Sequence, residues 1–172
     1  KGLSPQAAGL VLLAQPVVQA LFSPAAGRLS DRMDAGRVAS LGMAITASGL
    51  VMLLMTGTGS PLGYVVSALV VLGFGYALFS SPNSNAIMGA VSRPHYGVAS
   101  SVVTTMRAVG MSTSMAFATV MISVFVGETA IGPENVPSLL QAMRVCFGIS
   151  IVLCCFGIAA SLARGRVGGE PS

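Results

Sequence analysis

The sequence has 172 residues, of which 53% are hydrophobic and only 8% are charged. A water-soluble domain carries about a quarter charged residues, because its surface must be hydrated. The low charge content therefore excludes a soluble globular domain and indicates an integral membrane protein. Gly, with 21 residues, and Pro, with nine, are both frequent, which is typical of membrane helices.

Five apolar segments follow one another along the chain, and each is long enough to cross a hydrocarbon core about 30 Å thick as an α-helix. Lipid offers no partner for unpaired backbone groups, and no segment alternates in polarity as a barrel strand does. The sequence therefore predicts an all-α fold with five transmembrane helices. The predicted ranges are residues 5–22, 38–56, 62–91, 98–126 and 138–163, within a membrane region over 1–164 that is followed by a cytoplasmic tail over 165–172.

The first predicted helix carries two amide side chains one turn apart, Gln15 and Gln19, which flank Pro16. Proline removes a backbone donor and tends to kink a helix. Two interpretations are open at this point. Either the amides face a substrate cavity near the middle of the membrane, or they form hydrogen bonds with a neighbouring helix.

The connection to the second helix reads GRLSDRMDAGR over residues 27–37 and holds five of the fourteen charged residues of the chain. We call this segment the gate loop, and its candidate residues are Gly27, Arg28, Asp31, Arg32 and Arg37. A glycine permits two helices to approach closely. The carboxylate of Asp31 is expected to bond the amides at a helix N-terminus or to pair with an arginine.

The third predicted helix contains Pro82 near its end, and Asn83 and Asn85 follow it. A break at the proline would make these three residues a candidate hinge. The other interpretation is that the proline marks the point where the helix leaves the membrane.

The fourth predicted helix carries a polar stripe at intervals of four and three residues, which places its members on one face. The stripe consists of Ser100, Thr104, Arg107, Met111 and Ser114. Arg107 lies about 14 Å into that helix, where a charge is costly unless it is paired or hydrated. Either Arg107 lines a substrate cavity, or the helix begins in the cytoplasm and the side chain reaches the interface.

The spacing of Gly27, Asp31 and Arg32 resembles the loop signature of the major facilitator superfamily. Asp34 replaces the second glycine of that signature, and only Arg37 remains of its terminal basic cluster. The stretches GFGYALFSSPNSNAIMGAV and YGVASSVVTTMRAVGMSTSMAFAT are similar to the final helices of the fourteen-helix drug:proton antiporters. In the second stretch the positions that match are Gly97, Ala99, Ser100, Arg107 and Gly110.

This resemblance implies a secondary active transporter in which two helical lobes rock around a central site, with alternating access to the two sides of the membrane. It implies multidrug efflux: the export of drugs or other hydrophobic small molecules in exchange for protons. The partners are then the lipid bilayer, a small-molecule substrate and protons. The gate loop is then a conformational gate, and Gln15, Gln19 and the polar stripe are the candidate substrate cavity.

The chain is expected to be the C-terminal part of such a carrier, because it begins with Lys1 rather than Met and resembles only the last five helices. All five acidic residues fall outside the predicted helices. A carboxylate that titrates during proton transport is therefore expected in the missing N-terminal part of the same protein.

Basic residues accumulate at one end of the predicted helices. That end holds Arg28, Arg32, Arg37, Arg93, Arg164 and Arg166, against Lys1 alone at the other. Because short cytoplasmic loops are enriched in Lys and Arg, the N-terminus is predicted outside and the C-terminus inside, in a bacterial inner membrane. The net charge of +4 is accounted for by these loops, so no nucleic acid is expected as a partner.

The sequence contains no Walker loop, zinc-ligand cluster or nucleophile elbow. We therefore expect no enzyme activity, no metal site and no cofactor. The alternative from another class of protein is a small non-transporting membrane scaffold or assembly protein, whose polar stripe binds a partner helix.

Overall fold

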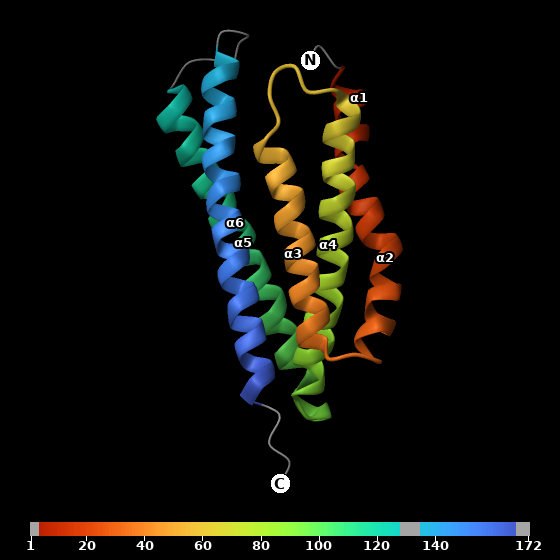
Figure 1. Ribbon diagram of the computed structural model, residues 1–172. Helices are drawn as coiled ribbons and strands as arrows, with labels where there is room; N and C mark the ends of the chain where they lie inside the picture. Colours follow the sequence, from red (N-terminus) through yellow and green to blue (C-terminus); the bar gives the residue numbers. More distant parts are fainter. Residues whose placement is uncertain (1–3, 128–134, 168–172) are drawn as a thin grey trace.

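The computed structural model describes residues 4–127 and 135–167, with side chains described up to Ser161. The described residues are mostly helical and include no strand, so the all-α prediction is confirmed (Figure 1). The elements are α1 (Pro5–Leu12), α2 (Ala14–Ser30), α3 (Ala35–Leu54), α4 (Leu62–Gly89), the short helix η1 (Arg93–His95), α5 (Tyr96–Val126) and α6 (Val136–Val167). Within the described ranges, five spans are long and apolar enough to cross a membrane, with α1 and α2 forming the first of them.

The first apolar helical span continues as helix to Ser30, past residue 22, where the predicted membrane segment ends. Apolarity reports where a helix leaves the lipid, not where its backbone hydrogen bonds stop. The span is interrupted at Leu13, three residues before Pro16. Proline has no N–H to donate to the carbonyl four residues earlier, so the kink expected from Pro16 falls in the preceding turn.

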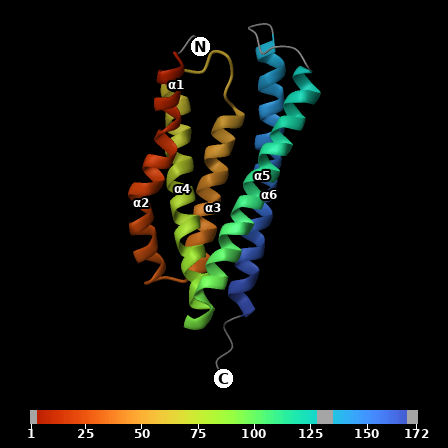
Figure 2. The ribbon, with the colours of Figure 1, turned by 180° about the vertical axis from the view of Figure 1, so that it is seen from behind.

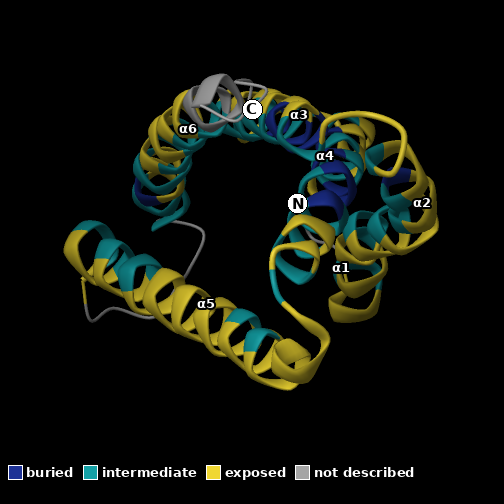
Figure 3. Ribbon diagram, turned by 90° about the horizontal axis from the view of Figure 1, so that it is seen from below, coloured by how far each residue is buried: buried dark blue, intermediate teal, exposed yellow. Residues whose placement is uncertain are grey.

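Helices α3 and α4 form the most tightly packed pair, and most of the buried residues lie on them (Figure 3). Glycines make the close approach possible. A Cβ atom added to Gly42 would lie 2.5 Å from the backbone nitrogen of Phe79, and one added to Gly75 would lie 2.6 Å from that of Thr46. Two backbones therefore meet directly, as is common where membrane helices pack through small residues.

Helix α5 is placed differently from the others. It runs diagonally from the end of α4 to the side of α6, as Figures 1 and 2 show. All residues of α5 are described, and none of them is buried. It packs mainly against α6 and only weakly against α4. Helices α4 and α5 therefore diverge and leave a groove between them.

The start of α1 and the end of α6 lie at opposite ends of the bundle (Figure 1). The turn from α2 to α3, the connection from α4 to α5 and the end of α6 share one end. Arg28, Arg37 and Arg93 therefore belong to the same end of the molecule. Which side of the membrane this end faces stays a prediction.

Candidate functional site

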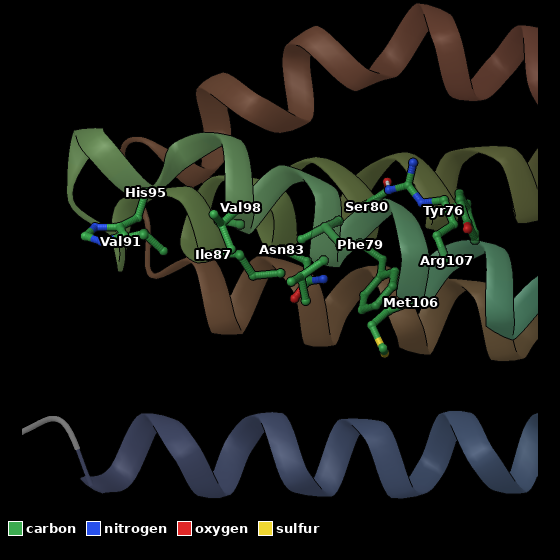
Figure 4. Close-up of a pocket in the computed structure, with 13 residues that line it drawn as sticks. Tyr76, Phe79, Ser80, Asn83, Ile87, Val91, His95, Val98, Met106 and Arg107 are labelled. Carbon is green, nitrogen blue, oxygen red and sulfur yellow. Dashed lines mark hydrogen bonds between the residues drawn. The ribbon is translucent and has the colours of Figure 1, made fainter.

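A groove of about 660 Å³ lies between α4 and α5, beside η1 (Figure 4). Its lining is mainly apolar, with a few polar groups. The lining residues are Tyr76, Phe79, Ser80, Asn83, Ile87, Val91, His95, Val98, Ala99, Val102, Val103, Met106 and Arg107. A mainly apolar pocket of this size with a few placed polar groups is typical of small-molecule binding sites.

Arg107 meets α4 across the groove. Its Nη2 donates to the hydroxyl oxygen of Ser80 at 3.5 Å, the long limit of a hydrogen bond. Ser80 lies nine residues before the end of α4 at Gly89, which corresponds to about 14 Å along the helix axis. The contact of Arg107 therefore lies about 14 Å from the end of α4, and whether this depth is inside the lipid or near its interface stays a prediction.

The guanidinium of Arg107 forms no ion pair within the described residues. The carboxylates in that part of the chain are those of Asp31 and Asp34, both at the turn between α2 and α3. A positive charge that lies within the hydrocarbon region is costly unless it finds water or an anionic partner. The groove is the place where the structure offers room for either.

Two aromatic residues of α4, Tyr76 and Phe79, line the groove together with Arg107 of α5. The rings of Tyr76 and Phe79 have centroids 6.4 Å apart and an interplanar angle of 65°. Figure 4 shows Tyr76, Ser80 and Arg107 at one end of the groove and His95 at the other. Tyr76 and Ser80 thus lie at the Arg107 end, Asn83 lies near the middle of the groove, and Ile87 and Val98 lie between Asn83 and His95.

The rest of the polar stripe on α5 does not line this groove. Ser100, Thr104, Met111 and Ser114 are exposed, and the hydroxyl of Thr104 donates to the carbonyl of Ser100 in its own helix at 2.9 Å. Of the five stripe residues, only Arg107 is brought to the α4 side. A substrate-binding role for the other four stays a prediction.

Gln15 and Gln19 lie half-buried on α2, away from the groove. A Cβ atom on Gly73 would lie 2.5 Å from the backbone oxygen of Gln15, so α2 touches α4 at this glycine. Neither amide side chain forms a hydrogen bond within the described residues. Both interpretations of the two glutamines stay predictions.

The candidate hinge residues lie in continuous helix, because α4 runs through Pro82 without a break as far as Gly89. Pro82 is fully buried, and Asn83 lines the groove. Asn85 donates from its side-chain nitrogen to the hydroxyl of Ser30 at 3.3 Å, which links α4 to the end of α2. A hinge role for these residues stays a prediction.

The non-helical turn between α2 and α3 is shorter than the gate loop, which was defined as residues 27–37. Gly27 and Arg28 belong to the last turns of α2, and α3 has begun by Arg37. A Cβ atom on Gly27 would lie 3.1 Å from the hydroxyl of Ser81, so this glycine lies where α2 approaches α4. Within the described residues, neither Asp31 nor Arg32 forms a side-chain hydrogen bond or ion pair.

Asp34 performs the capping that the sequence suggested for Asp31. Its Oδ1 accepts a hydrogen bond from the backbone N–H of Gly36 at 3.1 Å, and its Oδ2 lies 3.8 Å from Nε of Arg37. The available signal was an Asp directly before the first helical residue, a preferred helix N-cap. The substitution of the second signature glycine by Asp34 therefore has a structural role.

The sequence profile of the Major Facilitator Superfamily matches residues 1–171. The chain belongs to this superfamily. It is 32% identical to the riboflavin transporter RibZ of Clostridioides difficile over 117 residues, which are 68% of this chain and 26% of that protein. It is 32% identical to the uncharacterized transporter YebQ of Escherichia coli over 165 residues, 96% of this chain and 34% of that protein.

A third relative of this major facilitator chain is the multidrug resistance protein Stp of Mycobacterium tuberculosis, 30% identical over 116 residues. These residues are 67% of this chain and 21% of that protein. The chain thus spans about a third or less of the curated relatives it matches. No solved structure matches it. All three relatives are named as transporters or resistance proteins, which supports a non-enzymatic membrane protein and gives no support to the scaffold alternative.

Proposed function

We propose that this chain is part of a secondary active transporter that exports drugs or other hydrophobic small molecules in exchange for protons. The observation that carries this proposal is the mainly apolar groove of about 660 Å³ between two membrane-spanning helices. Met106 and Phe79 line it from opposite helices and give it an adaptable apolar surface. The relative named as a multidrug resistance protein supports the same substrate class.

The geometry also supports alternating access. The pair α3 and α4 is held by direct backbone contact, whereas α5 has no buried residue and touches α4 weakly. A change in the angle between α5 and α4 would open or close the groove without disturbing the packed pair. In the complete carrier, this motion would accompany the rocking of two lobes around the substrate.

Proton coupling in this proposal depends on the rest of the carrier. The chain has five acidic residues, and none of its described carboxylates lies in a membrane-spanning helix. The group that titrates would therefore be an acidic side chain of the missing N-terminal part. The partner of this chain in transport is that part of the same protein.

The proposal is tested by dye export from cells that express the complete carrier containing this chain. The cells are loaded with a hydrophobic fluorescent dye and energised, and the decline of cell fluorescence is followed with and without a protonophore. We expect export that stops when the protonophore collapses the gradient. Export that continues under the protonophore while ATP is present would contradict proton coupling.

A substitution in the groove connects this assay to the structure. Met106→Trp adds bulk inside the groove, and we expect it to slow dye export at an unchanged amount of protein. Met115→Trp is the matched control, because Met115 lies on the same helix, is 74% exposed and does not line the groove. Equal export by the two variants would remove the groove from the transport path.

A further inference from the structure

We infer that the groove selects molecules with an aromatic body and an anionic or strongly hydrogen-bond-accepting group, and that Arg107 binds this group. This inference rests on the proposed function, because it names the chemistry of the substrate of that same groove. It separates this chain from an exporter that favours organic cations.

The first support for this inference comes from the charges of the residues that line the groove. Of the thirteen lining residues, Arg107 is the one that carries a permanent charge. None of the thirteen is Asp or Glu. A bound organic cation would therefore be repelled by the guanidinium without any carboxylate to compensate. An anion in the same place would form the charge-assisted, bidentate contact for which a guanidinium is suited.

The hydrogen-bonding state of Arg107 carries the second step. A guanidinium has five N–H donors, and the structure uses one of them, in the 3.5 Å contact with Ser80. The contact holds the side chain toward α4 and leaves the other donors free of partners within the described residues. Because Arg107 is exposed, these donors are accessible to an acceptor that comes from a bound molecule.

The aromatic pair defines the other half of the substrate. Tyr76 and Phe79 lie on α4 within the turn that precedes Ser80, the contact of Arg107, with their rings in an edge arrangement. A planar ring system can pack against them while its acceptor group reaches Arg107. Beyond them the groove continues along Ile87 and Val98, where an aliphatic or second aromatic portion would lie.

The test uses three fluorescent probes that share one ring system: anilinonaphthalene sulfonate, its uncharged sulfonamide, and an analogue that carries a trimethylammonium group instead. Binding to the purified complete carrier is measured by fluorescence titration. Export of each probe is measured in cells. We expect the carrier to bind the sulfonate at least roughly tenfold more tightly than the trimethylammonium probe, because a charge-assisted hydrogen bond replaces a repulsion.

Three variants test whether Arg107 causes the preference for the sulfonate. Arg107→Gln should abolish the preference for the sulfonate, Arg107→Lys should keep most of it, and Arg144→Gln is the control because Arg144 is exposed on α6 and lies outside the groove. A melting temperature in detergent that equals that of the unsubstituted carrier shows that a variant still folds. A preference for the trimethylammonium probe, or a preference for the sulfonate that survives Arg107→Gln, would overturn the inference.

The outcomes separate the inference from the proposed function. If the carrier binds the sulfonate through Arg107 but exports none of the probes, the inference holds and the proposed export function fails. If the carrier exports the trimethylammonium probe and the sulfonamide but neither binds nor exports the sulfonate, the proposed function holds and the inference fails.

Discussion

The hydroxyl of Ser40 on α3 donates a hydrogen bond of 2.9 Å to the hydroxyl of Ser161 on α6. Ser161 in turn donates to the backbone carbonyl of Gly36 at 3.1 Å, so the two side chains tie the start of α3 to the last part of α6. Ser40 is 6% exposed, and its hydroxyl also lies 2.8 Å from the carbonyl of Gly36, so the one hydroxyl proton is shared between two acceptors. These hydrogen bonds connect the α3–α4 pair to α6, against which α5 packs.

Removal of either hydroxyl should loosen α6. We expect Ser40→Ala and Ser161→Ala each to lower the free energy of unfolding by about 1 kcal/mol, as for other hydrogen bonds between membrane helices. The double variant should lose less than the sum of the two, because both substitutions break the same bond. Reversible unfolding in detergent measures these values. Ser48→Ala is the control, since its exposed hydroxyl bonds within α3. If the losses of the two single variants add up fully in the double variant, Ser40 and Ser161 are not coupled.

Gly42 should tolerate no side chain. A methyl group there would lie 2.5 Å from the backbone nitrogen of Phe79, where backbone cannot move aside without separating α3 from α4. We expect Gly42→Ala to destabilise the protein by about 1–3 kcal/mol. Gly63→Ala is the control, because no atom lies within 4 Å of its added carbon. Equal melting temperatures for the two variants in detergent would disprove the close contact.

Asp34 should matter as a helix cap rather than as an ion-pair partner. Its pair with Arg37 spans 3.8 Å between side chains that are 79% and 53% exposed, and such pairs contribute little. We expect Asp34→Ala to cost about 1 kcal/mol of stability and Asp34→Asn much less, because Asn also caps helices. Thermal unfolding of both variants decides this, and an equal loss in the two would favour the ion pair.

Asp31 is expected to affect transport but not stability. Its carboxylate has no partner within the described residues, so Asp31→Ala should leave the melting temperature unchanged. If the gate loop controls the conformational change, as the family resemblance implies, the same variant should slow dye export by the complete carrier. Unchanged export at unchanged protein level would remove Asp31 from the gate.

The predicted orientation is open to chemical labelling. In a variant whose native Cys146, Cys154 and Cys155 are replaced by Ser, single cysteines are placed at Ser92 and at Thr58, which lie at opposite ends of α4. A maleimide that cannot cross the membrane should label Thr58→Cys in intact cells and Ser92→Cys only after permeabilisation. The reverse pattern would invert the proposed topology.

The sequence by itself determined the fold class and the family. Low charge, five apolar segments and the spacing of Gly27, Asp31 and Arg32 are one-dimensional signals, because the bilayer imposes length and polarity on each helix separately. The same signals do not report where a helix ends: the backbone continues as helix to Ser30, past the apolar segment that ends at residue 22, since polarity marks the edge of the lipid and not the last hydrogen bond.

Only the tertiary structure decided which polar residues meet. The stripe on α5 shares one face by spacing, yet of its members only Arg107 lines the groove beside α4. The side of α5 that faces the groove carries Ala99, Val103 and Met106, whereas Ser100 and Thr104, in the same stretch of the helix, lie outside the lining. The pairing of Ser40 with Ser161, and the capping by Asp34 rather than Asp31, likewise depend on how helices pack and where turns close. Contacts between distant segments follow from the relative placement of helices, which no spacing along a single helix encodes.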